Sequence, residues 1–160
     1  FFAGIFVIIV TEDKIMRETF GDRLKELMDR SGIKSDALGR AVSVSGQTVR
    51  AWRAGKQTIT RTRLIALARY FGCTLDFLAG RSDDDTPRYI TRTPPPFYEN
   101  LRAVMKECGV SWYRVTHDTA IKDSYFTGWS RGCDPRLDSL IALADYLDVT
   151  IDRLVGLEKL

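Results

Sequence analysis

Residues 34–56 have the sequence KSDALGRAVSVSGQTVRAWRAGK, and this stretch decides the fold of the chain. Its apolar residues recur at helical spacing in two short groups, as expected for two helices that each bury one face. These residues are Leu38, Val42, Val49 and Trp52. Ser35 and Ser45 stand at the two expected helix starts, where a serine hydroxyl caps a free N–H, and Gly55 stands where the second helix should end. We therefore expect two short helices joined by a turn.

Helices are also expected on both sides of this stretch. An apolar stripe at spacings of i, i+4, i+7 and i+8 precedes it and ends near Gly32. The stripe consists of Phe20, Leu24, Leu27 and Met28. Two further helices are expected at about residues 61–71 and 74–80, the last one capped by Thr74. No segment alternates like a β-strand, so residues 16–81 are predicted to form an all-α unit of five helices.

A second copy of this unit follows at a spacing of 77 residues, which is long enough for a whole domain. The matched pairs are Phe20 and Phe97, Leu24 and Leu101, Met28 and Met105, Gly32 and Gly109, Trp52 and Trp129, and Gly55 and Gly132. After one deleted residue, LIALARYFGCTLDFLAG (64–80) aligns with LIALADYLDVTIDRLVG (140–156), and Thr150 takes the capping place of Thr74. The sequence therefore predicts a tandem repeat of five-helix domains, with residues 97–160 as the second.

The segment between the copies, residues 82–96, has the composition of a linker. It contains three consecutive aspartates, four prolines and no helical stripe, which indicates an extended chain with a stiff polyproline end. Together with Arg81 it would reach about 50 Å when fully extended. We therefore expect that the two units are able to sit well apart.

Residues 1–10, FFAGIFVIIV, are apolar but do not have the pattern of a targeting segment. A membrane-spanning helix needs about 20 apolar residues, and a signal peptide needs a basic segment before its apolar run. Codons for Thr11, Glu12 and Asp13 can contain the ribosome-binding sequence GGAGG shortly before the codon of Met16. We therefore expect residues 1–15 to be a disordered leader, or translated leader that is not native.

Charge is distributed unevenly between the two predicted domains. Residues 16–81 hold 13 Lys and Arg against six Asp and Glu, a net charge of +7, whereas residues 97–160 hold eight against ten, a net charge of −2. Such an asymmetry indicates that the first domain alone is suited to a polyanion.

No pattern of catalytic or metal-binding residues accompanies the repeat. The three cysteines, Cys73, Cys108 and Cys133, form no CxxC pair, so we expect reduced thiols in a cytoplasmic protein and no metal site. His117 is the sole histidine, with no nucleophile or glycine-rich phosphate loop beside it. We expect neither an enzyme nor a cofactor, a small-molecule substrate or a membrane partner.

The stretch 34–56 and its repeat resemble the Cro and phage-repressor family of helix-turn-helix proteins, often called the XRE family. The resemblance includes the small Gly39 where the two short helices cross and the LIALA helix that follows. It implies lambda-repressor-like domains that bind double-stranded DNA in a prokaryote or phage. The base-facing positions that it implies are Gly46, Gln47, Arg50 and Ala51. The phosphate-contacting positions that it implies are Lys34, Ser35, Ser45, Arg53 and Lys56.

The second copy matches these positions with less suitable residues. Its candidates for DNA contact are Lys122, Asp123, Ser124, Thr127 and Arg131, with Gly128 at the remaining base-facing position. A carboxylate such as that of Asp123 repels phosphate unless it accepts a hydrogen bond from cytosine. This domain therefore either contacts DNA or serves as a pairing surface.

The sequence predicts a DNA-binding transcriptional regulator that inserts the helix after Ser45 into the major groove. Repression is the favoured mode of action. Gln47 would bond to adenine, and Arg50 would bond to guanine or hold a phosphate. An alternative is a protein interaction module in which the acidic second domain mediates dimerisation or partner binding. An intramolecular pseudo-dimer and a homodimer are both compatible with the sequence.

Overall fold

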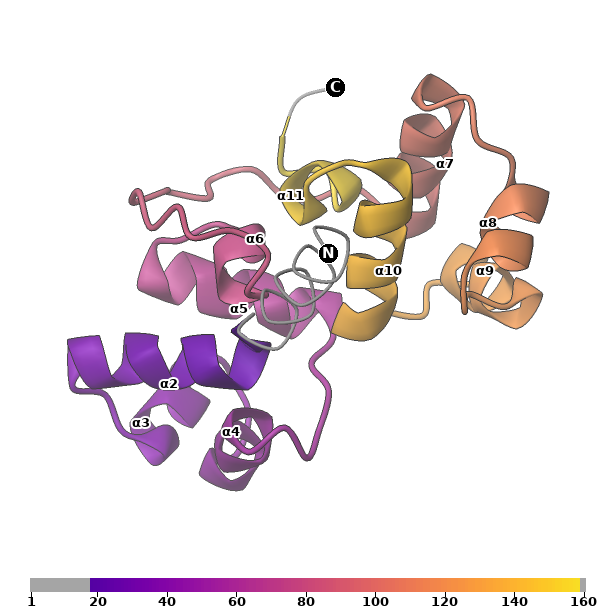
Figure 1. The fold of residues 1–160 in the computed structure, drawn as a ribbon. Coiled ribbons are helices and arrows are strands. Elements are labelled where there is room, and N and C mark those ends of the chain that lie inside the picture. Colours follow the sequence, from indigo (N-terminus) through magenta and orange to yellow (C-terminus); the bar gives the residue numbers. More distant parts are fainter. Residues whose placement is uncertain (1–17, 159–160) are drawn as a thin grey trace, which may run out of the picture.

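The computed structural model describes residues 18–158, and these form ten helices and no strand (Figure 1). The first five are α2 (Phe20–Ser31), α3 (Ser35–Ala41), α4 (Gly46–Arg53), α5 (Arg61–Phe71) and α6 (Leu75–Leu78). The second five are α7 (Phe97–Glu107), α8 (Trp112–Asp118), α9 (Asp123–Ser130), α10 (Leu137–Leu147) and α11 (Ile151–Leu154). The all-α prediction is confirmed over this part of the chain, whereas the prediction for residues 1–15 lies outside it. None of the described helices is long and apolar enough to cross a membrane.

Capping hydroxyls and glycines set most of the helix ends. The hydroxyl of Ser45 accepts the N–H of Thr48 at 3.1 Å at the start of α4, and Thr74 and Thr150 cap α6 and α11 in the same way. Gly32 ends α2 with a φ of +69°, in the left-handed region that glycine adopts at little cost.

The predicted cap at Ser35 is wrong by one residue. Lys34 has the extended backbone of an N-cap, and Ser35 is the first residue inside α3, with a side chain that is almost fully buried. A lysine side chain cannot accept a hydrogen bond, so this helix start is held by packing. In the second copy, the residue that corresponds to Lys34 is Ser111. Its hydroxyl does cap the helix, because it accepts a hydrogen bond from the N–H of Arg114.

Close backbone approach holds α4 in place within the first unit. A Cβ atom at Gly39 would lie 2.7 Å from the carbonyl oxygen of Val44, so α3 and the turn before α4 pack at a distance that only glycine allows. A Cβ atom at Gly21 would lie 2.7 Å from the carbonyl oxygen of Arg53, so α2 packs equally closely against the end of α4. These two contacts fix the direction of α4 relative to the rest of the unit.

The two units pack directly against each other, although the linker is long enough to let them sit well apart. An antiparallel bridge joins Thr60 to Arg136. Beside it, the N–H of Arg61 donates to the carbonyl oxygen of Pro135 and the N–H of Leu137 donates to that of Ile59, both at 2.8 Å. The length of the linker limits only how far the two units can separate. Their actual positions are determined by the hydrogen bonds between residues 59–61 and residues 135–137.

A second contact between the units is made by two buried aspartates. Asp152 accepts the N–H of Leu75 at 3.0 Å, and Asp76 accepts the N–H of Ile151 at 2.9 Å, so each carboxylate holds the first N–H of the helix in the other unit. Arg81 pairs with Asp76, and its Nε lies 2.9 Å from Asp145 of the second unit. Burial, and then the negative charge of Asp76, raise the pKa of Asp152 to about 7.

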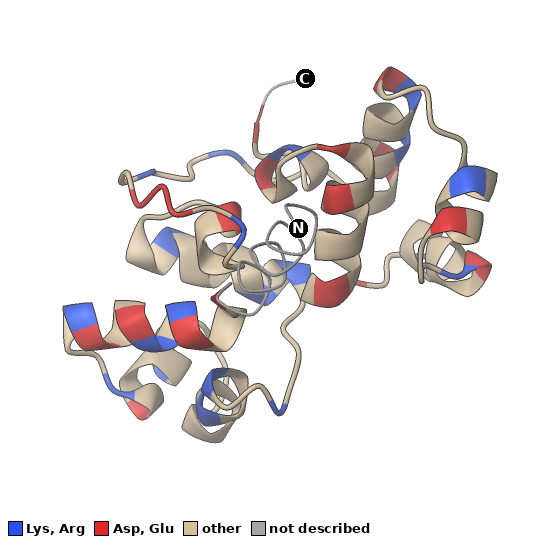
Figure 2. Cartoon of the chain, viewed as in Figure 1, with Lys and Arg blue, Asp and Glu red and all other residues tan. Residues whose placement is uncertain are grey.

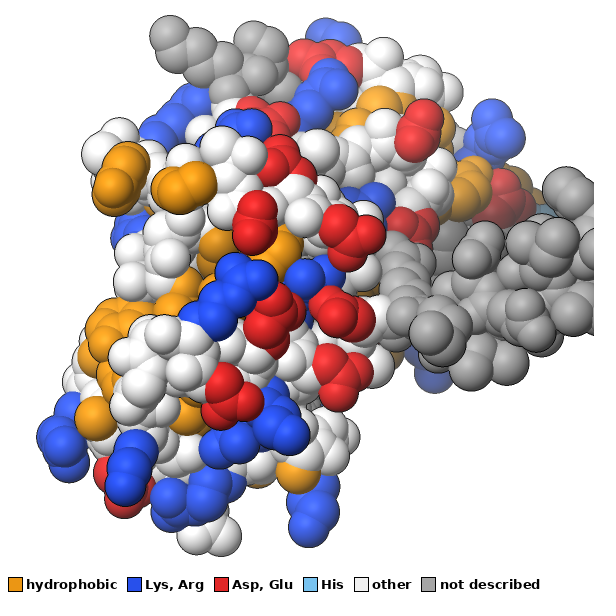
Figure 3. Space-filling model, turned by 60° about the vertical axis from the view of Figure 1, so that its left-hand side comes forward, with side chains coloured by type: hydrophobic (Ala, Val, Ile, Leu, Met, Phe, Trp, Pro, Cys, Tyr) orange, Lys and Arg blue, Asp and Glu red, His pale blue; other side chains and the backbone are white. Residues whose placement is uncertain are grey.

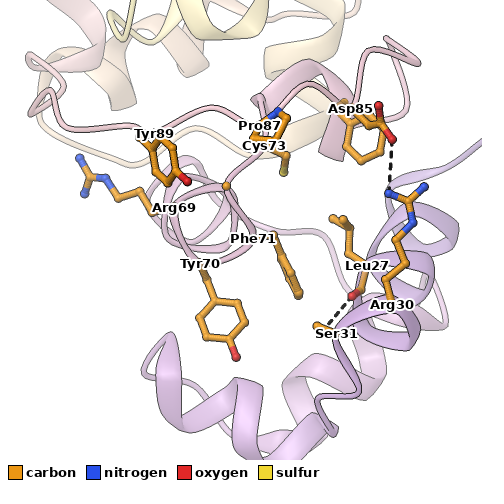
Figure 4. A pocket seen from close by; sticks show the side chains of 12 residues that line it. Leu27, Arg30, Ser31, Arg69, Tyr70, Phe71, Cys73, Asp85, Pro87 and Tyr89 are labelled. Atoms are coloured by element: carbon orange, nitrogen blue, oxygen red, sulfur yellow. Dashed lines mark hydrogen bonds and ion pairs between the residues drawn. The ribbon is translucent and has the colours of Figure 1, made fainter.

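Residues 82–96 contain no helix, but they lie against the helices. Arg88 donates its N–H to the carbonyl oxygen of Gly72 at 2.8 Å, and Arg92 donates from its guanidinium to the carbonyl oxygen of Glu158. The linker lines one side of a hollow of about 420 Å³, and Leu27 and Phe71 line the other side (Figure 4). In the same place Asp85 of the linker pairs with Arg30. This segment is therefore part of the packed structure.

The approach at Gly39 predicts a contrast between two glycines. Gly39→Ala should lower the free energy of unfolding by about 1–3 kcal/mol, because the added methyl group overlaps a backbone carbonyl that cannot move freely. Gly128→Ala should raise it by up to about 1 kcal/mol, because the nearest atoms of Cys133 lie at an ordinary 3.7 Å and alanine favours the helix. Urea unfolding of both variants measures this contrast, and equal destabilisation would contradict the close packing.

The raised pKa of Asp152 predicts how stability depends on pH. Because the folded state holds the proton more tightly than the unfolded chain, this residue stabilises the fold at low pH, and the contribution is lost as the pH rises from about 4 to about 7. Asp152→Asn keeps an oxygen for the N–H of Leu75 and removes the charge, so it should melt above the wild type at pH 8 and less so at pH 5. Asp138→Asn, at an exposed position of α10, is the control. A melting difference that does not change with pH would contradict the assignment.

Candidate nucleic-acid interface

Helix α4 has one buried and one solvent-facing side. Val49 is fully buried and Trp52 is 2% exposed, whereas Gln47 and Arg50 are exposed on the outer side. In Figure 1, α4 lies at the periphery of the molecule, next to α3. The predicted base-facing residues with long polar side chains are therefore both accessible. Gly46 and Ala51, which flank them in the sequence, are half-buried.

Asp36 is part of this surface, and the sequence analysis missed it. Its Oδ1 lies 3.2 Å from Nη1 of Arg50, and both side chains are more than half exposed. A Cβ atom at Gly46 would overlap this carboxylate, so glycine lets Asp36 keep the position in which it pairs with Arg50. The only signal in the sequence is an acidic residue in the first turn of α3, which is common for reasons of helix stability alone.

Four of the predicted phosphate-contacting and base-facing residues line one surface hollow. It has a volume of about 520 Å³ and lies between the end of α2, the start of α3 and the outer side of α4. These four residues are Lys34, Ser35, Arg50 and Arg53, and Asp29 and Asp36 also line it. Ser35 is only 7% exposed, so it contributes little to this surface.

The remaining predicted residues lie beyond this hollow. Ser45 is exposed at the start of α4, where its hydroxyl is 2.9 Å from that of Thr48, and Lys56 is exposed just past the end of the helix. Figure 2 shows Lys and Arg along α4, and Figure 3 shows such side chains gathered at the lower end of the first unit. The positive charge of Arg50, Arg53 and Lys56 thus lies at the last turn of α4 and just beyond it.

Helix α9 occupies the matching place in the second unit with different chemistry. Phe126 and Trp129 are buried, and the candidates Asp123, Ser124 and Thr127 are exposed. Lys122 is the N-cap residue and Arg131 the C-cap residue, so the two cations stand at the ends of the helix. The exposed large side chains nearby are aromatic: Trp112, Tyr113 and Tyr125.

The remaining reactive groups are dispersed. Asp118 accepts a hydrogen bond from the hydroxyl group of Tyr146 at 2.6 Å and contacts Nδ1 of His117 at 2.8 Å, and these bonds lower the pKa of the exposed Asp118 carboxyl. Cys73 is buried, as its apolar surroundings in the sequence suggest, and burial raises the pKa of its thiol to about 12. Within residues 18–158, no group of three or more His, Cys, Asp or Glu is arranged to hold a metal ion.

A short helix packed across a second one whose polar side faces solvent defines a helix-turn-helix unit of the kind that enters the major groove of DNA. Residues 23–84 match the family model described as a Cro/C1-type HTH DNA-binding domain. No curated protein and no solved structure matches the chain significantly. The family match covers the first unit and supports an XRE-like helix-turn-helix domain there, and with it a DNA-binding regulator.

The contact between Asp36 and Arg50 predicts a gain of function. Asp36→Asn removes a negative charge from the surface around α4 and frees the guanidinium, so affinity for duplex DNA at low salt should rise by about threefold to tenfold. Fluorescence anisotropy with a labelled duplex measures it.

Glu99→Gln is the matched control, because it makes the same charge change at an exposed position of α7 in the second unit. It should raise affinity less than Asp36→Asn. Weaker binding of every duplex by the Asp36 variant would mean that this side of α4 does not face DNA.

Proposed function

We propose that this chain is a sequence-specific transcriptional regulator that inserts α4 into the major groove. The observation that carries the proposal is the outer side of α4, where Gln47 and Arg50 are exposed beside a hollow that Lys34 and Arg53 line. Base-specific donors flanked by cations are what a helix needs to read a duplex. The net charge of +7 on residues 16–81 favours the same partner, because each phosphate neutralised releases a counterion.

The base-facing residues divide the task between them. The Gln47 amide can bond to N6 and N7 of adenine, and the Arg50 guanidinium can bond to O6 and N7 of guanine. Gly46 and Ala51 have no long side chain, so α4 can approach the base edges closely. In this arrangement Arg50 exchanges its contact with Asp36 for a contact with DNA.

Phosphate contacts would come from both ends of α4. Lys34, Arg53 and Lys56 provide charge, and Ser45 provides a hydroxyl beside the first free N–H groups of the helix. Ser35 contributes little, because the residue is nearly fully buried. We propose repression as the mode of action, since occupying a promoter needs nothing more than this surface. Free thiols are compatible with the reducing cytoplasm of a prokaryote or an infected host.

A second candidate function is supported by the outer surface of the second unit. Trp112, Tyr113 and Tyr125 are exposed there, and aromatic residues of this kind are enriched in protein interfaces. In this alternative the second unit binds a protein partner and leaves DNA to α4 alone. Replacement of Tyr113 by Ala would then leave DNA affinity unchanged and reduce regulation in the cell.

The proposed base contacts predict two different effects on binding. Gln47→Ala and Arg50→Ala should each weaken binding to the preferred duplex by about 1–3 kcal/mol and leave binding to unrelated duplexes nearly unchanged. Lys56→Ala should weaken all duplexes alike and reduce the dependence of affinity on salt. The preferred duplex is obtained by selecting bound sequences from random DNA with the wild type.

Circular dichroism spectra of the three variants should match the wild type, because all three side chains are exposed. An unchanged sequence preference in both the Gln47 and the Arg50 variant would show that another element reads the bases.

A further inference from the structure

The contacts between the two units are reciprocal. The bond from Arg61 to Pro135 has its counterpart in the bond from Leu137 to Ile59, and these residues correspond at a spacing of 76. The same holds for the aspartates: the bond from Leu75 to Asp152 is matched by the bond from Ile151 to Asp76. In a two-fold arrangement, position i of the first unit contacts position j of the second, and position j of the first unit contacts position i of the second. The two units of this chain show this pattern, so a two-fold axis relates them.

This relation determines where the two helices α4 and α9 lie. A two-fold rotation leaves positions along its axis unchanged, so corresponding helices lie at the same level on opposite sides of the axis. In Figure 1, α6 and α11 lie next to each other near the middle of the molecule, whereas α4 lies at its lower edge and α9 at its right-hand edge, on either side of α5 and α10. One chain thus places two helix-turn-helix units as a dimer places its two subunits.

The pairing surface of the first unit is already occupied within the chain. Asp76 and Asp152 are each 7% exposed, and the side chain of Arg61, paired with Asp134 at 3.0 Å, is only 16% exposed. A second chain could reach this surface only by displacing α10 and α11. The first unit therefore does not have this surface free for pairing with a second chain.

The two helices do not present the same chemistry to a duplex. α4 carries Gln47 and Arg50, whereas the corresponding residues of α9 are Ser124 and Thr127, with Asp123 at the position of Gly46. A symmetric protein selects a palindromic site because its halves are identical. A pseudo-symmetric protein with unlike halves selects two unlike half-sites.

Resting on the DNA-binding function proposed above, we propose that one chain binds one non-palindromic duplex site composed of two half-sites. α4 reads the bases of one half-site, and α9 rests in the next major groove on the same side, about one helical turn away. Ser124 and Thr127 contribute hydroxyl contacts there, and Asp123 favours cytosine, whose amino group can donate to its carboxylate. Selectivity is therefore strong in one half-site and weaker in the other.

The experiment uses the full chain and duplexes selected from a pool with a random 30-base-pair region. Sedimentation velocity of the saturated complex should give one chain per duplex, and the selected sequences should align into a non-palindromic site. Two chains on a palindromic duplex would overturn this inference and leave the proposed function intact. A chain that selects no duplex even at low salt would overturn the proposed function and this inference together.

A double variant tests the contribution of α9 without disturbing its core. Ser124→Ala with Thr127→Ala changes two exposed side chains and should weaken binding to the selected duplex by about threefold to tenfold. Base changes in the weaker half-site should then matter only at the cytosine that Asp123 contacts, whereas base changes in the α4 half-site should matter as before. If the double variant binds like the wild type and the weaker half-site cannot be found, α9 does not contact DNA and the inference is wrong.

Discussion

The close packing of α3 against the turn that leads into α4 is the constraint on which the rest of the structure depends. Gly39 leaves the carbonyl group of Val44 room to approach, and Gly21 does the same for the carbonyl group of Arg53. With both ends of α4 held by backbone contacts, Val49 and Trp52 point into the core and Gln47 and Arg50 point outward. A rigid element is what a recognition surface requires, because base contacts tolerate little displacement.

Two buried aspartates restrict how the two units pack against each other. Asp76 and Asp152 lose hydration, and the backbone N–H groups and Arg81 compensate for part of that loss. An apolar pair at these positions would pack against many neighbours, whereas a carboxylate that needs one particular N–H accepts only one alignment of α6 against α11. The aspartates therefore select the two-fold arrangement over other ways of packing two apolar surfaces.

The features that the sequence predicted are local ones. The spacing of Leu24, Leu27 and Met28 and the caps at Ser45 and Thr74 depend on a few neighbouring residues, so pattern and propensity were sufficient. The missed features are tertiary. Asp36 of α3 lies against Gly46 of α4, so this contact depends on how two helices pack. The docking of residues 82–96 depends on hydrogen bonds to backbone carbonyl groups, which the composition of the segment does not reveal.

Covalent linkage makes the pairing of the two units independent of protein concentration. Two separate domains would pair only to the extent that their concentration allows, whereas a short connection holds each in the millimolar range relative to the other. Residues 82–96 strengthen this effect because they are themselves fixed against α5 and against the end of the second unit. Once pairing no longer requires identical surfaces, the outer side of α9 is free to diverge from that of α4 while the buried Trp52 and Trp129 and the aspartate pair stay alike. Similarity inside and difference outside is what selection on two unlike half-sites would produce.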